Sequence, residues 1–324
     1  MIIPEASIVT HVFLFYRNCY LTSDKFPQTQ LSKYSGVIYH ARDICERGHD
    51  PGILNLRHQI KGPIMFFLLE SPVHDCALDF WRFNHVFNWT ISYRRNSDFF
   101  LPYNGFEAKT KMGNIRSVGH INLKRKLVFW LVKNMGSPGG RDTYIQELEK
   151  HIRVDRWGGG TKHHCPPETE GRGCKAQLAQ RYKFYLAFEN SLCKDYVTEK
   201  FFDILKFDVV PVVYGLSNYS AFAPPHSFID ARDFSSPKSL GEYLTYLDNN
   251  DEEYLKYFKW KEEYHLMGFQ AISGKVLCDM CERINHLDDL RRPAYSSEEM
   301  ESWWRGTKDN QICQSPKGVF PEIF

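Results

Sequence analysis

Short apolar runs separated by polar segments recur along the chain and predict alternating strands and helices. The runs GVIYHA (36–41) and IMFFLL (64–69) are bounded by Gly, Pro or charged residues, which is typical of strands buried on both faces. WTISYRRNSD (89–98) mixes aromatic and β-branched residues and predicts a third strand. The intervening segment 47–59 is rich in Gly, Asp, Pro and Arg and fits either a helix or a loop.

The second half of the chain repeats this alternation more regularly. Its predicted strands are 127–132, 152–157, 183–190 and 209–215. Its predicted helices are 142–151, 198–206, 236–247 and an aromatic segment over 251–263, with 161–176 as a polar, Cys-bearing loop. Ser236 and Pro237 have the form of an N-cap followed by a first helical turn. Strands that alternate with helices in this way indicate an α/β fold with parallel sheets.

Two such halves predict two facing Rossmann-like domains. Apolar periodicity is weak over 103–124, so we expect a linker near these residues. The predicted organisation is an N-terminal domain over 1–110, a linker over 111–126, a second domain over 127–290 and a Cys-containing extension over 291–324. In open sheets of this kind, ligands bind at the carboxyl ends of the strands.

Composition and charge exclude several classes of protein. The 324 residues include 41 Lys and Arg against 39 Asp and Glu, and this near balance gives no concentrated basic face for nucleic acid. Apolar runs such as 64–69 are far shorter than the ~20 residues of a membrane-spanning helix. The start, MIIPEASIVTHVFLFYRNC, lacks a basic segment and a clear cleavage site, so we do not expect a signal peptide.

Cysteines and glycosylation sequons favour a secretory lumen. The chain has 9 Cys, and Asn88 and Asn218 each begin an Asn-X-Ser/Thr sequon that would be used only in such a compartment. The odd number of cysteines leaves at least one thiol free or bonded to another chain. Cys278 and Cys281 have the spacing of zinc ligands, but no second such pair accompanies them, which argues against a zinc ribbon.

The densest candidate chemistry lies in KFYLAFENSLCKDYVTEKFF (183–202). An apolar strand ends in a polar loop, and a helix opens near Thr198 with Glu199 and Lys200 in its first turn. Helix amino termini and lysine side chains both bind anions, so the segment predicts a diphosphate site, with Glu199 available to sugar hydroxyls. The alternative is an ordinary strand–loop–helix junction with solvated charges. The chain has no GxGxxG after a strand, no Walker loop, no HExxH and no pair of Asp residues at i, i+2.

The same segment resembles the α1,3-fucosyltransferases of glycosyltransferase family 10. The similarity rests on FYLAFENS and DYVTEK, followed by VVPVVYG, SNY and SPK. Further blocks resemble the family in the same order: CYLTSDK (19–25), VIYHARD (37–43), LLESPVH (68–74), FNWTISYRRNSDFFLPY (87–103) and ELEKHIRVDRWG (147–158).

The resemblance implies a two-domain GT-B fold and an inverting transfer of fucose. The implied donor is GDP-β-L-fucose, and the implied acceptor is N-acetylglucosamine of glycoprotein N-glycans, linked α1,3. It further implies a Golgi type II membrane protein whose anchor lies outside this chain. No metal cofactor is implied as a requirement, with a divalent cation such as Mn²⁺ as a stimulator only.

Candidate site residues follow from matching positions. The implied GDP-fucose contacts are Asn134, Arg141, Tyr185, Asn190, Ser191, Tyr196, Glu199 and Lys200. Lys133 departs from the family pattern, which has Ser at this position. An inverting transfer needs a base but no nucleophile, and the family's candidate base falls on Glu70, at the end of a predicted strand. His74 and Glu189 remain alternative bases.

The sub-class rests on fewer residues than the family. EMESWWRG (299–306), with Cys313 beyond it, resembles the invertebrate and plant enzymes that fucosylate the N-glycan core. NMGSPGGRD (134–142) differs from the usual core-type loop, so a Lewis-type enzyme acting on N-acetyllactosamine remains an alternative. A non-catalytic relative that binds nucleotides or glycans is the other. Family members also carry a CxxC near Cys278 that takes part in disulfides.

Overall fold

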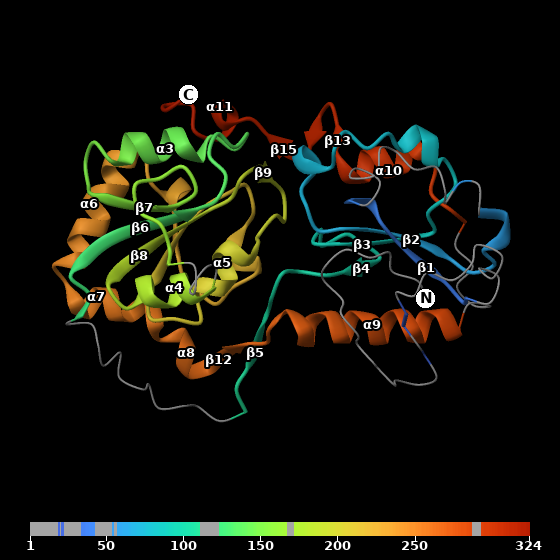
Figure 1. Ribbon diagram of the computed structural model, residues 1–324, viewed down its shortest axis with the longest axis horizontal. Coiled ribbons are helices and arrows are strands. Elements are labelled where there is room, and N and C mark those ends of the chain that lie inside the picture. Colours follow the sequence, from blue (N-terminus) through green and yellow to red (C-terminus); the bar gives the residue numbers. More distant parts are fainter. Residues whose placement is uncertain are drawn as a thin grey trace. The chain divides into compact units, whose positions relative to one another are not determined.

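The computed structural model describes residues 19, 21, 22, 34–42, 54, 57–110, 123–166, 172–286 and 293–324 (Figure 1). The chain divides into two compact units. Unit 1 comprises Met1–Pro102 and Phe269–Cys313, and unit 2 comprises Tyr103–Gly268 and Gln314–Phe324. Among the residues described, no helix combines the length and the apolar character that crossing a membrane requires.

Unit 1 is built on a parallel sheet with the strand order β1-β2-β3-β4. The strands are β1 (Val37–His40), β2 (Ile64–Leu68), β3 (Trp89–Ser92) and β4 (Phe99–Phe100). Phe66, at the centre of β2, is fully buried, and its ring contacts those of Phe80, Phe87 and Trp304. These aromatic residues form part of the hydrophobic core of unit 1 and pack against the centre of its sheet.

Two helices from late in the sequence complete unit 1. In α9 (Phe269–Asn285), Arg283 lies 4.6 Å from the ring of Phe99. A disulfide joins Cys281 of α9 to Cys19, across 262 residues of chain. The helix α10 (Ser297–Trp304) begins with a capping box and precedes a short hairpin of β13 (Gly306–Thr307) and β14 (Asn310–Gln311). Trp304 is fully buried and donates its Nε1–H to Asp75 at 2.9 Å.

Unit 2 contains a five-stranded parallel sheet with the order β11-β10-β8-β6-β7. The strands are β6 (Lys126–Val132), β7 (Val154–Gly158), β8 (Tyr182–Phe188), β10 (Val210–Tyr214) and β11 (Ile229–Asp230). A separate antiparallel pair joins β5 (Phe106–Ala108) to β12 (Tyr264–Leu266), and β9 (Leu192–Cys193) is a two-residue strand. The two-residue strand β15 (Cys313–Gln314) contains the division between the units.

Helices cover both faces of the unit 2 sheet (Figure 1). The α3 (Arg141–Leu148), α6 (Pro237–Asp248) and α7 (Asp251–Leu255) helices pack on one face, and α4 (Arg172–Ala179) and α5 (Glu199–Ile204) pack on the other. Alternate residues of β8 therefore enter different cores: Phe184 faces α6 and α7, whereas Tyr185 faces α4 and α5. Burial on both faces explains why these strands are continuous apolar runs.

All seven predicted strands are present, with adjustments at their ends. The strand expected over 89–98 ends at Ser92, because the next residues form a turn in which Ser97 donates its N–H to the carbonyl of Arg94. The aromatic helix expected over 251–263 is divided into α7, a 3-10 turn over Lys256–Phe258 and α8 (Trp260–Glu263). The expected loop over 161–176 already contains the start of α4.

The unit boundaries differ from the predicted domain ranges. Residues 103–110 belong to unit 2 rather than to the first domain, because β5 pairs with β12. Helix α9 belongs to unit 1 rather than to the second domain, since it packs on β4 and is bonded to Cys19. The expected extension 291–324 is shared between the units, with the division after Cys313. Most of the expected linker, 111–122, lies outside the described residues.

Candidate active site

The strand order of unit 2 creates a switch point at the carboxyl ends of β6 and β8. From β6 the chain turns to β7 on one side, and the later strands β8, β10 and β11 continue on the other. Open α/β sheets bind ligands in the crevice at such a point, because the two connections leave on opposite faces. Asn134 and Arg141 follow β6, and Glu189, Asn190 and Ser191 follow β8. The fold thus brings two sets of predicted donor residues to the same edge of the sheet.

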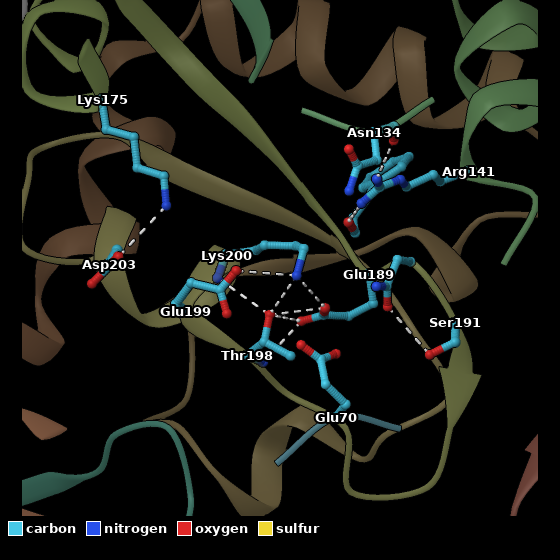
Figure 2. Close-up of polar contacts among 12 residues, drawn as sticks. Glu70, Asn134, Arg141, Lys175, Glu189, Ser191, Thr198, Glu199, Lys200 and Asp203 are labelled. Atoms are coloured by element: carbon cyan, nitrogen blue, oxygen red, sulfur yellow. Dashed lines mark hydrogen bonds and ion pairs between the residues drawn. The ribbon is translucent and has the colours of Figure 1, made fainter. Parts of the chain in front are cut away.

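Arg141 links the two strand ends at this switch point. It is the first residue of α3 and is 5% exposed. Its Nη1 donates to the carbonyl of Phe188 at 3.0 Å, and its Nη2 donates to the carbonyl of Asn134 at 2.8 Å (Figure 2). Its Nε is buried and makes no hydrogen bond with the residues described. Burial lowers the pKa of the guanidinium, so the two carbonyl contacts hold a desolvated cation in a fixed orientation.

Lys200 lies within a cluster of acidic and hydroxyl groups at the start of α5. Figure 2 shows its amine directed toward Glu189, Thr198 and Glu199. The Nζ lies 3.3 Å from Glu189 Oε2, 3.2 Å from Glu199 Oε1 and 2.9 Å from Thr198 Oγ1. Thr198 is the N-cap of α5, so the helix start and the cation share one anchor. The lysine side chain is 22% exposed and retains access to a ligand.

Glu189 is the buried counter-ion of this cluster. Its side chain is fully buried, and Oε1 accepts the Thr198 N–H at 2.8 Å while Thr198 Oγ1 lies 2.9 Å from Oε2. Burial raises the pKa of Glu189 despite the nearby Lys200 charge. A carboxylate that is enclosed and held by these partners cannot reach an acceptor sugar. The geometry therefore removes Glu189 from the candidate bases.

The two other charges of the cluster are shifted in the sense of an ion pair. Burial acts to lower the pKa of Lys200, but Glu189 and Glu199 together raise it above its usual value. Burial acts to raise the pKa of Glu199, and the Lys200 charge outweighs this effect and lowers it. Lys200 and Glu199 are consequently charged at neutral pH, as binding of a diphosphate and of sugar hydroxyls would require.

The remaining predicted donor residues have different surroundings. Asn190 accepts the Gly139 N–H through its carbonyl at 2.8 Å, and its side chain accepts the Ser191 hydroxyl at 3.3 Å. Tyr196 is buried with its ring 6.5 Å from that of Tyr103. Tyr185 is enclosed in the core beneath α4 and α5, which favours a packing role over the donor contact that we expected. Its role in donor binding stays a prediction.

Lys175 and Asp203 form a buried ion pair that the sequence did not indicate. Lys175, on α4, is 9% exposed, with its Nζ 3.6 Å from the Asp203 carboxylate and 5.9 Å from the centre of the Tyr185 ring. Burial lowers the pKa of this lysine. In the sequence, Lys175 is distinguished only by its apolar neighbours Cys174 and Ala176, within the segment 161–176 that is predicted as a loop. Lys133, by contrast, is exposed.

Glu70, the predicted base, lies beyond the carboxyl end of β2 in unit 1. Its side chain is 33% exposed, and Oε1 lies 3.5 Å from Nη1 of Arg42, which follows β1. Because β1 and β2 are parallel neighbours, both side chains emerge at the same edge of the sheet. His74, the alternative base, ends the 3-10 turn Pro72–His74 and is partly buried. Both side chains are partly buried, so their exposure does not favour one of the two as the base.

The two sequons differ in accessibility. Asn218 and Ser220 are both exposed, at a 3-10 turn after β10. Asn88 instead lies immediately before β3, and its Oδ1 accepts the N–H of Ile64, the first residue of β2, at 3.0 Å. Thr90 is buried and bonded to Asp98. Asn218 therefore has the surface position that glycosylation needs, whereas the side chains of Asn88 and Thr90 are engaged in hydrogen bonds within unit 1.

Cysteine pairing agrees with an oxidising compartment. Cys165 is bonded to Cys174, and Cys281 is bonded to Cys19. Three further cysteines, Cys76, Cys193 and Cys313, are also in disulfides. Within the CxxC pair only Cys278 is a free thiol. Cys281 is engaged in the disulfide with Cys19, so its sulfur is not available as a zinc ligand.

Comparison with known proteins identifies two family domains. Residues 9–104 match the fucosyltransferase N-terminal domain, and residues 121–303 match the C-terminal domain of glycosyltransferase family 10 (fucosyltransferase). The second match contains the whole switch-point site, from Asn134 to Lys200.

Two curated relatives illustrate the range of the similarity. The glycoprotein 3-alpha-L-fucosyltransferase A of Drosophila melanogaster is 38% identical over 248 residues, which is 75% of this chain and 47% of that protein. The 4-galactosyl-N-acetylglucosaminide 3-alpha-L-fucosyltransferase FUT6 of Homo sapiens is 38% identical over 272 residues, covering 82% of this chain and 71% of that protein. The chain thus spans about half the length of the Drosophila relative.

Solved structures show the same fold. A crystal structure of an α1,3-fucosyltransferase superposes with a TM-score of 0.54 at 18% identity, covering 82% of this chain and 81% of that one. The structure of an α1,3-fucosyltransferase with GDP gives a TM-score of 0.52 at 17% identity, with the same coverage. The predicted α/β GT-B fold with parallel sheets is therefore confirmed. With matches over 9–104 and 121–303, this chain belongs to glycosyltransferase family 10, the fucosyltransferases.

Proposed function

We propose that this protein transfers L-fucose from GDP-β-L-fucose to N-acetylglucosamine of glycoprotein N-glycans, in an α1,3 linkage and with inversion. The observation that carries the proposal is the placement of Arg141 and Lys200 at the carboxyl edge of the unit 2 sheet, inside the family match. Two cations fixed at a switch point form a site for the diphosphate of a nucleotide sugar. Asn134, Asn190, Ser191, Tyr196 and Glu199 would complete the donor contacts.

The chemistry requires one base and charge stabilisation at the leaving group. The acceptor oxygen O3 attacks C1 of fucose, the bond from C1 to the β-phosphate oxygen breaks, and the O3 proton passes to a carboxylate. Glu70 is the residue that we propose as this base. GDP leaves with added negative charge on its β-phosphate, and Arg141 and Lys200 are the groups proposed to stabilise that charge. No covalent intermediate is needed.

This division of roles implies that a bound metal is not required. In glycosyltransferases that use a divalent cation, the metal neutralises the departing diphosphate. Here two protein cations are available for that task. We therefore propose a metal-independent transfer, which a divalent cation such as Mn²⁺ stimulates only modestly.

The core N-acetylglucosamine is the acceptor that we favour. The segment EMESWWRG, which resembles core-type enzymes, contributes most of α10 and packs into unit 1 through buried Trp304. The Lewis-type alternative, with N-acetyllactosamine as acceptor, is supported by the similarity to FUT6. We place the reaction in the Golgi lumen, where the disulfides and an exposed Asn218 sequon are both expected, with a membrane anchor in the full-length protein. Nucleic acid is not an expected partner.

The deciding experiment presents GDP-fucose with two acceptors in parallel, a core N-glycan glycopeptide and N-acetyllactosamine. Mass spectrometry follows the addition of fucose, and GDP binding is measured by calorimetry on the same preparation. Transfer to the glycopeptide alone is the expected result. Transfer to N-acetyllactosamine alone would assign the protein to the Lewis type. GDP binding with transfer to neither acceptor would indicate a non-catalytic relative, and absence of GDP binding would overturn the donor assignment.

A further inference from the structure

The loop that leads to Arg141 is held by a tyrosine from another strand. Tyr214, the last residue of β10, is buried and donates its hydroxyl to the carbonyl of Gly139 at 2.7 Å. The Gly139 N–H in turn donates to the carbonyl of Asn190 at 2.8 Å. Burial raises the pKa of Tyr214, so its hydroxyl keeps its proton and remains a donor. The loop is thus fixed to β8 and β10 one residue before Gly140.

The carboxy-terminal segment 316–324 packs directly on this tyrosine. The segment begins with the short helix α11 (Pro316–Val319), which lies near the start of α3 in Figure 1. The ring of Phe320 stacks on that of Tyr214, with centroids 4.6 Å apart and an interplanar angle of 8°. It also meets Tyr144 of α3 edge-on at 5.3 Å. Phe320 therefore contacts both the strand end and the helix that frame the loop.

The same segment fills the space beside Gly140, the residue that precedes Arg141. Gly140 has a φ of +70°, in the left-handed region that favours glycine. A Cβ atom at this position would lie 2.6 Å from Cζ of Phe324 and 2.7 Å from Cγ of Pro316. The segment 316–324 thus contacts the turn at Gly140, while Tyr214 and Asn190 bind it at Gly139.

These contacts converge on the orientation of Arg141. Among the described residues, its guanidinium donates to two carbonyl oxygens, that of Asn134 just before the loop and that of Phe188 at the end of β8. A shift of the turn at Gly139 and Gly140 would move the first residue of α3 and alter both hydrogen bonds. A short chain of contacts therefore runs from Phe320 through Tyr214 and Gly139 to Arg141, the residue proposed to bind the phosphate.

We propose that segment 316–324 is a positioning element for the donor site, in which Phe320 and Tyr214 fix the loop 137–140 and thereby orient Arg141 toward the diphosphate. The inference rests on the proposed role of Arg141 in donor binding. Phe320 and Tyr214 do not touch the donor themselves. Changing Phe320 or Tyr214 should alter the orientation of the Arg141 guanidinium without removing its charge. We therefore expect the change to appear in the affinity for GDP and in the KM for GDP-fucose.

Two variants test the chain of contacts at different points. Phe320→Leu removes the stacked ring. We expect this variant to fold, because Phe320 lines a cavity of about 190 Å³ together with Phe234 and Ile323, and the segment can relax into that space. Tyr214→Phe removes only the hydroxyl that binds Gly139. Each should weaken GDP binding about fivefold in calorimetry, within the range seen for coupled neighbours, and raise the KM for GDP-fucose with a smaller change in kcat.

A matched control separates positioning from general stability. Phe258 is 2% exposed in the same core, where its ring lies 5.3 Å from that of Tyr254 and 5.4 Å from Nζ of Lys261, neither of which belongs to the loop 137–140. Phe258→Leu should lower the melting temperature comparably to Phe320→Leu and leave GDP affinity unchanged. Equal losses of GDP affinity in the two variants would reduce Phe320 to a structural residue and overturn the inference.

The sharper test repeats each variant in an Arg141→Ala background. If Phe320 and Tyr214 act through Arg141, their fivefold effects on GDP affinity disappear once the guanidinium is gone. Effects of the same size in both backgrounds would overturn the positioning role and leave the proposed function intact. A wild-type protein that does not bind GDP would overturn the proposed function, and this inference with it.

Discussion

Removal of the Lys200 amine should affect both donor binding and stability, because the amine has two tasks. In Lys200→Met the aliphatic stem is kept, but the contacts to Glu189 at 3.3 Å and to Glu199 at 3.2 Å are lost. Loss of a charge-assisted phosphate contact should weaken GDP binding roughly 10- to 100-fold, equivalent to about 1.5–3 kcal/mol. The stability effect arises separately, since Glu189 is left as a buried carboxylate without its cation.

The stability loss can be bounded from the structure. Breaking a fully buried ion pair by removing one partner costs about 3–5 kcal/mol. Lys200 is 22% exposed, and Glu189 keeps the N–H and hydroxyl of Thr198, so we expect a smaller loss of about 2 kcal/mol. For a unit of this size, that corresponds to a fall in melting temperature of roughly 4–8 °C. Differential scanning calorimetry of the purified variant measures it.

The pH dependence of this loss has a definite sign. Burial raises the pKa of Glu189 in the folded protein above its unfolded value, so the folded state holds a proton that the unfolded state releases. The stability that the folded protein gains by binding this proton more tightly is fully present below the unfolded pKa of Glu189, and it is lost as pH rises through the folded pKa. Without Lys200 the folded pKa rises further. The melting temperature of Lys200→Met should therefore fall further below that of the wild type at pH 8 than at pH 5.

The double variant Lys200→Met/Glu189→Gln provides the control. A neutral amide at position 189 needs no cation, so the double variant should recover at least half of the lost melting temperature while GDP binding stays weak. A double variant no more stable than Lys200→Met would refute the idea that the buried charge of Glu189 causes the loss. Unchanged GDP affinity in a folded Lys200→Met protein would remove Lys200 from the donor site.

Three further predictions address the base, the metal and the unit 2 core. Glu70→Gln should reduce transfer by about 10²–10⁴ with GDP affinity unchanged in calorimetry, and full activity would direct attention to His74. EDTA should leave most of the transfer rate, whereas loss of turnover restored only by Mn²⁺ or Mg²⁺ would contradict a metal-independent site. Asp155→Asn should cost about 2 kcal/mol at pH 6. Burial acts to raise the pKa of Asp155, but hydrogen bonds from Lys126, Tyr182 and Arg153 outweigh it and lower the pKa to about 2. The contribution is present above the unfolded pKa and lost as pH falls through about 2, so the thermal stabilities of Asp155→Asn and wild type should converge in acid.

The strands of this protein could be predicted because their signal is local. Parallel strands buried on both faces are continuous apolar runs, and such runs as 183–188 leave little choice of structure. Pro211 lies within the apolar run of β10 without interrupting the strand. It is tolerated there because the neighbouring strand β11 pairs with Val212 and Val213, beyond the proline. Polar residues after a strand were likewise informative, since the carboxyl ends of parallel strands share one edge of the sheet.

The remaining features depend on contacts between distant segments, which no local pattern encodes. Helix α9 belongs to unit 1 because of a disulfide across 262 residues, and amphipathic character alone does not specify a partner. The burial of Lys175 depends on Asp203 from another helix. Glu189 is adjacent to the predicted donor residues in sequence, yet only its enclosure by Thr198 and Lys200 distinguishes a counter-ion from a base.

The two cations of the proposed donor site are held by different means, and this difference bears on catalysis. Lys200 is balanced by the carboxylates of Glu189 and Glu199, so its charge is largely neutralised before a ligand arrives. Arg141 donates to two uncharged carbonyl oxygens, which orient the guanidinium, while the charges of Asp142 and Glu189 act on it without a direct hydrogen bond. A diphosphate at this edge of the sheet would therefore experience Arg141 as the stronger net positive field and Lys200 as a local hydrogen-bond donor. Because both groups are fixed before the phosphate bond breaks, little reorganisation is needed as negative charge develops on GDP.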